Sequence, residues 1–190
     1  MKKFELTAEF VTNVFGKKLF RIKALVAFGN VEKGELGGFI EKEDNLSHGG
    51  NAWVYGDAWV SGDAQVSGDA RVYGNAWVSG DAQVSGNARV SGDAQVSGDA
   101  RVYGNARVSG NADYAVVAGF GRYFRTTTFF RCKDKILRVQ CGCFYGDLAQ
   151  FREIVKKTHG DSKYAKEYLA IADLMELHFA EEEEKQEAAE

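Results

Sequence analysis

Apolar and polar positions alternate with a fixed period of six residues from residue 51 to residue 110. Ten consecutive units follow the pattern [ND]-A-x-V-[SY]-G, from NAWVYG to NARVSG, with no insertion. If each unit is a short strand, Ala52 and Val54 point to one face and Trp53 points to the other. Gly56, followed by an acid, suits a sharp corner with positive φ. The pattern therefore predicts a coil of short strands and corners, which is a β-solenoid.

An interior of Ala and Val alone fits a narrow triangular prism, in which three hexads make one coil of eighteen residues. An aliphatic residue followed four places on by a small one, as in Val54 and Ala58 through Val108 and Ala112, resembles the hexapeptide-repeat proteins. This resemblance covers the central third of the chain. It implies a mainly β fold, a left-handed parallel β-helix of about 3 to 4 coils, and assembly as a homotrimer.

The flanks of the repeat have a different pattern. Residues 1–50 predict a β-hairpin with its turn around 13–17, then an irregular first coil that caps the prism with Ile40 and Leu46 in step with Ala52. The hexapeptide-repeat β-helix is assigned to residues 51–113.

Residues 114–180 predict an α+β module of three strands and two helices. Asp147 is the expected N-cap of the first helix, which ends at Gly160, and the second helix begins near Ser162. The apolar faces expected are Leu148, Phe151, Ile154 and Val155 on the first helix, and Tyr164, Tyr168, Ile171, Met175 and Phe179 on the second.

Charge is unevenly distributed along the 190 residues. The acidic segment 181–190 holds six acids and one Lys, which leaves 23 basic and 21 acidic residues elsewhere. We expect this segment to be disordered and solvating, with a helix extension or a mask over basic residues as alternatives. The segment 119–138 is the most basic, with Arg122, Arg125, Arg131, Lys133, Lys135 and Arg138 against Asp134.

No apolar run is long enough to span a membrane, and the N-terminus lacks the apolar core of a signal peptide. Three cysteines, Cys132, Cys141 and Cys143, are an odd number and poor material for disulfides. We therefore expect a cytoplasmic protein with reduced thiols.

Hexapeptide-repeat proteins include acyltransferases that use a catalytic His, so the three histidines need weighing. His48 could act as a general base facing a neighbouring subunit, but we favour a cap or turn residue. A cation at a helix C-terminus accounts for His159 without catalysis. The spacing of Cys141 and Cys143 does not favour a zinc site. A C-x-C pair in a strand places both thiols on one face, and two small buried side chains account for that pattern equally well. We predict no catalytic residue, metal or cofactor.

Outward positions of the repeat are more informative because no core dictates them. The eighteen-residue spacing stacks Trp53 beneath Arg71, Arg89 and Arg107, with Tyr55 and Tyr73 in a neighbouring row. Three adjacent guanidinium groups repel one another unless acids, aromatic faces or an anion separate them. They could be solvated arginines, part of a trimer interface, or a groove where Arg binds phosphate and an aromatic ring stacks on a base.

A second candidate site is GFGRYFRTTT, residues 119–128. Its two glycines permit close backbone approach, Arg122 and Arg125 could pair with phosphates, and Thr126 and Thr127 could donate hydrogen bonds. It lacks the Lys of a phosphate-binding loop. A hairpin turn followed by an edge strand is the alternative.

The order of parts, from KGELGGFIEKEDNL through the hexads to TTTFFRCKDKILRVQCGCFYGDL, resembles small hexapeptide-repeat proteins encoded by phages and prophages of Gram-positive bacteria. The resemblance implies a phage accessory protein that antagonises host defence. We hypothesise a non-catalytic homotrimer that sequesters a small anionic, nucleotide-type ligand. The alternatives are a protein-binding inhibitor or scaffold that acts on a host defence protein, and an acyltransferase. Duplex nucleic acid is disfavoured because the hexads carry six Asp against four Arg.

Overall fold

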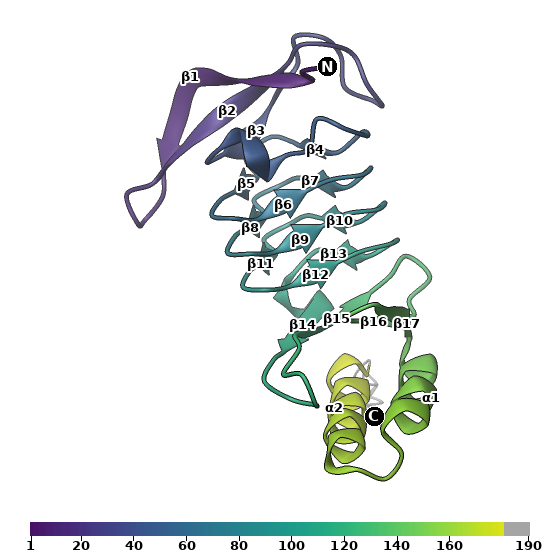
Figure 1. The fold of residues 1–190 in the computed structure, drawn as a ribbon. Coiled ribbons are helices and arrows are strands. Elements are labelled where there is room, and N and C mark those ends of the chain that lie inside the picture. The colour runs from purple at the N-terminus through teal and green to yellow at the C-terminus, as the bar shows by residue number, and fades with distance from the viewer. Residues whose placement is uncertain (181–190) are drawn as a thin grey trace, which may run out of the picture.

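The computed structural model describes residues 1–180, so the expectations for the acidic segment 181–190 lie outside the described residues. The chain forms a three-sided parallel β-solenoid of about four turns, with a β-hairpin at one end and a small sheet with two helices at the other (Figure 1). The predicted mainly β fold with a solenoid centre is confirmed.

Each coil contributes one two-residue strand to each of three sides. The first side contains β4 (Trp53–Val54), β7 (Arg71–Val72), β10 (Arg89–Val90) and β13 (Arg107–Val108). The second contains β5 (Trp59–Val60), β8 (Trp77–Val78) and β11 (Gln95–Val96), and the third β6 (Gln65–Val66), β9 (Gln83–Val84) and β12 (Arg101–Val102). All these pairs are parallel and in the eighteen-residue register that the repeat predicted.

The interior of the solenoid is made of the repeat's Ala and Val side chains, which have no exposed surface from Ala52 to Val108. Corner glycines allow successive coils to stack closely. Gly80 has a φ of +67°, and a Cβ there would lie 2.8 Å from the backbone nitrogen of Gly98 in the next coil. Such a contact excludes any side chain without a backbone shift, which explains the Gly at this corner.

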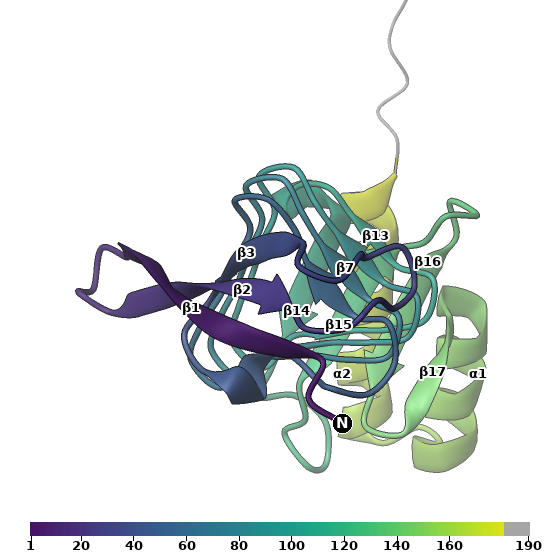
Figure 2. The same ribbon diagram turned by 90° about the horizontal axis from the view of Figure 1, so that it is seen from above.

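The N-terminal end is capped by the predicted hairpin. Strands β1 (Phe4–Thr12) and β2 (Lys18–Ala24) pair antiparallel, and β3 (Leu36–Ile40) joins the solenoid by parallel pairing with β5. The short helix η1 (Glu43–Asn45) follows. The hairpin projects sideways from the solenoid (Figure 2).

The predicted register of the first coil is wrong. Ile40 pairs with Val60 and Leu46 with Val66, so both occupy valine rows of the solenoid and are out of step with Ala52. The cause is a longer corner between Leu46 and Val54, which are eight positions apart where the repeat has six.

The C-terminal module follows η2 (Asn111–Asp113). Its antiparallel sheet has four strands where three were expected, in the order β14 (Tyr114–Val117), β15 (Thr127–Arg131), β16 (Leu137–Cys141) and β17 (Phe144–Asp147). Strand β15, which begins at Thr127 within the 119–128 segment, is an inner strand of the sheet and not an edge strand. Phe130 packs into the solenoid core and Phe129 into the helical core, so the sheet lies between them.

Helices α1 (Leu148–His159) and α2 (Lys163–Phe179) begin at the predicted N-caps, Asp147 and Ser162, and α1 ends at Gly160. Both caps accept a backbone hydrogen bond through their side chains. Two residues assigned to the apolar faces are partly exposed, Ile154 at 38 % and Tyr164 at 37 %.

Candidate functional site

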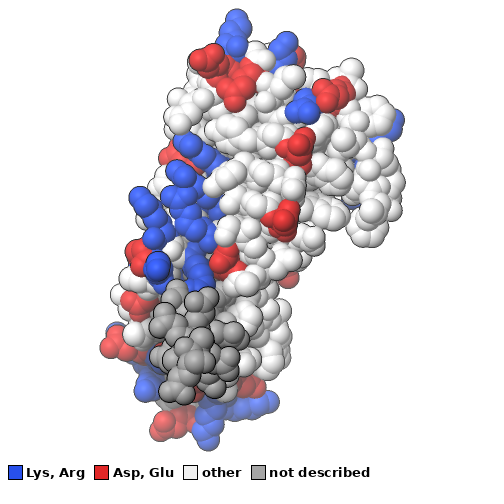
Figure 3. All heavy atoms as spheres, turned by 180° about the vertical axis from the view of Figure 1, so that it is seen from behind, with Lys and Arg blue, Asp and Glu red and all other residues white. Residues whose placement is uncertain are grey.

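The arginine column consists of Arg71, Arg89 and Arg107, which lie on adjacent strands of one solenoid face. Their backbones pair in register, so the side chains are separated by about one strand spacing, roughly 4.8 Å. All three are partly exposed. Within residues 1–180, none of them has a carboxylate partner within ion-pairing distance. Figure 3 shows basic side chains running along one side of the solenoid.

Trp53, assigned to the same row as a ligand-binding residue, is fully buried. Its ring packs edge-on against Phe4 and Phe28, with centroids 6.2 Å and 5.4 Å away, because the N-terminal segment covers this end of the face. Its indole N–H has no hydrogen-bond partner. Trp53 is therefore part of the hydrophobic core between the N-terminal segment and the first coil, and it is unavailable to a ligand bound by the arginine column.

Tyr55 and Tyr73 lie directly after strands β4 and β7, two positions beyond the row that contains the arginine column. Burial raises the pKa of the Tyr55 hydroxyl, and the charges of Arg71 and Arg89 act in the opposite direction, which places this phenol within electrostatic reach of the column. Tyr73 is 36 % exposed. Both tyrosines can therefore border a ligand bound by the arginines.

The second predicted cluster lies in the C-terminal module. Arg122 and Arg125 line a cavity of about 240 Å³. Both guanidinium groups lie near the ring of Tyr123, at 5.5 Å and 4.9 Å from its centroid. The cavity walls come from β16, β17 and both helices, and sequence reasoning missed them: Phe144, Phe151, Val155, His159 and Tyr168.

The two threonines assigned to this cluster do not line the 240 Å³ cavity. Thr126 approaches Asp99, with its Oγ1 3.4 Å from the carboxylate, and lines a separate cavity of about 370 Å³ that Arg125 also lines. Thr127 is 2 % exposed and donates to the Sγ of Cys141, 3.2 Å away. Alternation along β15 turns Thr127 into the helical core, so it cannot contact a ligand.

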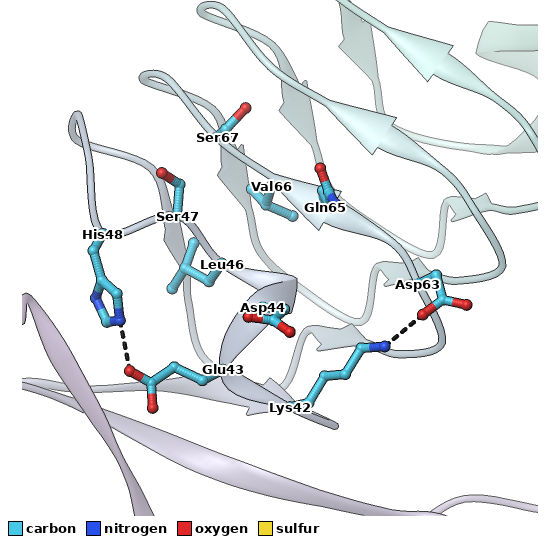
Figure 4. A pocket seen from close by; sticks show the side chains of 10 residues that line it. All are labelled: Lys42, Glu43, Asp44, Leu46, Ser47, His48, Asp63, Gln65, Val66 and Ser67. Atoms are coloured by element: carbon cyan, nitrogen blue, oxygen red, sulfur yellow. Dashed lines mark hydrogen bonds and ion pairs between the residues drawn. The ribbon is translucent and has the colours of Figure 1, made fainter.

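A polar basin of about 710 Å³ lies beside η1, where His48 faces Glu43 and Lys42 faces Asp63 (Figure 4). The Nδ1 of His48 accepts the backbone N–H of Lys3 at 3.2 Å, and its Nε2 contacts a Glu43 oxygen at 2.7 Å. The ring also stacks on Phe4.

Because both ring nitrogens of His48 are occupied, neither is free to take a proton from an acceptor substrate in this arrangement. The carboxylate of Glu43 also pairs with Lys2, and these two hydrogen bonds hold its pKa below the usual range. His48 and Glu43 therefore tie the N-terminal residues to the first coil.

No group of three His, Cys, Asp or Glu side chains within residues 1–180 could hold a metal ion. Cys132, Cys141 and Cys143 are free thiols, and burial raises the pKa of Cys132. None of the helices in this part of the chain is long and apolar enough to cross a membrane.

In a comparison with known families, residues 64–80, 82–98 and 100–112 match the YdcK beta solenoid repeat. The three matched segments are successive coils of the solenoid, and the hairpin and the C-terminal module lie outside them. No curated protein matches the chain. The comparison supports a repeat β-solenoid protein.

Proposed function

We propose that the protein is a non-catalytic binding protein whose arginine column captures a small phosphate-bearing ligand of nucleotide type. The observation that carries this proposal is the in-register stacking of Arg71, Arg89 and Arg107 without a carboxylate partner among residues 1–180. Guanidinium groups bind phosphate oxygens in pairs, and a multiply charged anion offsets the repulsion within the column.

The tyrosines extend the proposal to a base-bearing ligand. Tyr55 and Tyr73 can stack on a planar base while the arginines hold its phosphates. A second copy of the chain beside this open face would turn it into a groove, which is why we include a homotrimer in the proposal. In a phage, such a protein would antagonise host defence by removing a nucleotide signal.

The test is thermal unfolding of the full chain with a panel of mononucleotides and cyclic nucleotides. A ligand present at 100 times its Kd adds about 2.7 kcal/mol to the free energy of unfolding. We expect a higher Tm with at least one nucleotide, lost in Arg89→Gln and retained in Arg101→Gln, which changes an arginine on another solenoid side. No shift with any nucleotide would refute the proposal.

Subunit count is checked separately by native mass spectrometry of protein taken directly from cells. Trimers that retain a small molecule support the full proposal. A monomer that still responds to nucleotides would keep the ligand and remove the inter-subunit groove.

One observation favours protein binding as a second candidate function. The hairpin projects from the solenoid (Figure 2). Its turn, between β1 and β2, carries two exposed apolar side chains, Val14 at 86 % and Phe15 at 76 %. Exposed apolar groups on a protruding element are typical of a docking surface. A double Ser variant at these positions should lose a protein partner found in host lysate and keep any nucleotide-dependent shift in Tm. Retention of the partner would refute docking through the hairpin tip.

A further inference from the structure

The cavity of the C-terminal module combines cationic and apolar groups. It lies where the turn between β16 and β17 meets α1, α2 and the loop 118–126, and its volume is about 240 Å³. Its rim carries Arg122 and Arg125, and its walls include Phe144, Phe151, Val155 and Tyr168. Three of these four wall side chains are at least nine-tenths buried, and Phe144 is partly buried.

The position of Arg122 depends on the preceding glycine. Gly121 has a φ of +73°, and a Cβ there would lie 2.1 Å from the hydroxyl oxygen of Tyr168. The backbone N–H of Gly121 donates to Glu167 on α2 at 2.9 Å. Only glycine permits this approach, so the loop is fixed against α2 with Arg122 at the mouth of the cavity.

Arg125 lies at the boundary between this cavity and the neighbouring cavity that Asp81 and Asp99 line, and glycine at position 142 leaves room for its side chain. A Cβ added at Gly142, in the turn between β16 and β17, would lie 2.6 Å from the Nη1 of Arg125. Its guanidinium also faces the ring of Tyr123, 4.9 Å from the centroid. Within residues 1–180, neither Arg122 nor Arg125 forms an ion pair with a carboxylate. Two positioned cations therefore remain available to an anion.

The walls favour a flat apolar group. Phe144 and Phe151 lie with ring centroids 5.6 Å apart, and Phe151 meets Tyr168 edge-on at 5.8 Å. Tyr168 is 6 % exposed, and its hydroxyl is the buried polar group of the cavity wall. The side chain of His159 lies tilted over the Tyr168 ring at 5.8 Å.

We propose that this cavity binds a small amphipathic anion, with one carboxylate or phosphate head between Arg122 and Arg125 and a planar ring or short acyl chain against the aromatic walls. Apolar walls with a few convergent polar groups are the common form of small-molecule sites. This site goes beyond the arginine column: its lining contains none of Arg71, Arg89 and Arg107, and its walls select for an apolar body.

The experiment is isothermal titration of the full chain with 1-naphthoate, 1-naphthyl phosphate, octanoate and the neutral 1-naphthalenemethanol. We expect at least one anion to bind and the neutral analogue to bind at least tenfold more weakly. Whichever of 1-naphthoate and 1-naphthyl phosphate binds more tightly identifies the preferred head group. Comparing the affinities of octanoate and 1-naphthoate shows whether the cavity prefers an acyl chain or a planar ring. Equal binding of the neutral analogue, or no binding of any anion, would overturn the proposal.

Variants locate the site. Arg122→Gln and Arg125→Gln should each weaken binding roughly tenfold or more, the usual effect of losing one hydrogen bond between charged groups. Thr158→Trp, at an exposed position of the rim, should block entry without disturbing a buried contact. Arg101→Gln is the matched control, and Arg89→Gln tests binding to the column instead. Unchanged binding in all three cavity variants overturns the proposal, and loss of binding in Arg89→Gln instead assigns the anion to the column. Because nucleotide-induced shifts in Tm are read separately, the two proposals can fail independently.

Discussion

Replacing the central arginine of the column should stabilise the ligand-free protein. Arg89 has a like charge on each side, Arg71 and Arg107, at the spacing of adjacent strands. Two unit charges 4.8 Å apart in water repel by about 0.9 kcal/mol. Arg89→Gln removes two such pairs, so the free energy of unfolding should rise by up to about 1.7 kcal/mol at low salt. Side chains that fan apart reduce this figure, which is therefore an upper limit.

The pattern across variants separates charge repulsion from packing. Arg71→Gln and Arg107→Gln each remove one adjacent pair, so they should give about half the effect of Arg89→Gln. Arg89→Lys keeps the charge and should give none of the gain. Arg101→Gln should also give none, because its paired neighbour in the sheet is Gln83.

Urea unfolding at low and high salt measures the effect of the column variants. The gain from Arg89→Gln should shrink as salt rises, because a Debye length of about 3 Å at 1 M is shorter than the strand spacing. The reasoning is refuted if Arg89→Gln destabilises the protein at low salt, or if Arg89→Lys stabilises it equally.

Three further predictions concern the rest of the fold. Burial lowers the pKa of Lys3 from 10.5 to about 8. Between these values the unfolded chain binds more protons than the folded one, so the free energy of unfolding should rise with pH. Relative to Lys3→Met, the rise should be on the order of 1–2 kcal/mol from pH 7 to 9.5. A difference between the two proteins that does not change with pH in denaturant titrations would contradict this. Gly80→Ala should destabilise more than Gly98→Ala, since both have positive φ but only the first Cβ meets the next coil, at 2.8 Å; equal midpoints in urea would show that coil contact is not limiting. Phe130→Ala should lower the free energy of unfolding by about 3–5 kcal/mol, because this fully buried ring closes the prism end; calorimetry with Phe15→Ala, an exposed control, checks it.

The solenoid could be predicted from the sequence because its register is a property of the repeat. The uninterrupted six-residue repeat limits strand pairing to offsets that are multiples of six, because only these keep every valine inside. The narrow Ala and Val interior, together with the resemblance to hexapeptide-repeat proteins, selects eighteen, the offset at which Arg71 and Arg89 pair. The same reasoning failed one coil earlier. Leu46 precedes a corner with no repeat pattern, so nothing in the sequence shows that it pairs with Val66.

The candidate sites also differ in how far the sequence predicts them. The arginine column follows directly from the repeat, whereas the burial of Trp53 comes from Phe4 and Phe28, which are distant in sequence and reach it only through the N-terminal cap. Only part of the cavity in the C-terminal module could be predicted from the sequence. Arg125 was identified from local charge, but Tyr168 faces it only because two helices fold back onto the sheet.

Inward and outward positions of the solenoid strands have different roles, and this difference supports the proposal that the arginine column binds a ligand. Ala and Val side chains fill the core of every coil, and backbone hydrogen bonds connect each coil to the next. The core therefore does not require arginine at the outward positions of the strands, and the third side holds neutral Gln65 and Gln83 in successive coils. Arginine at three successive positions of one row adds repulsion that folding does not need. The anion of the proposed function would convert this repulsion into attraction.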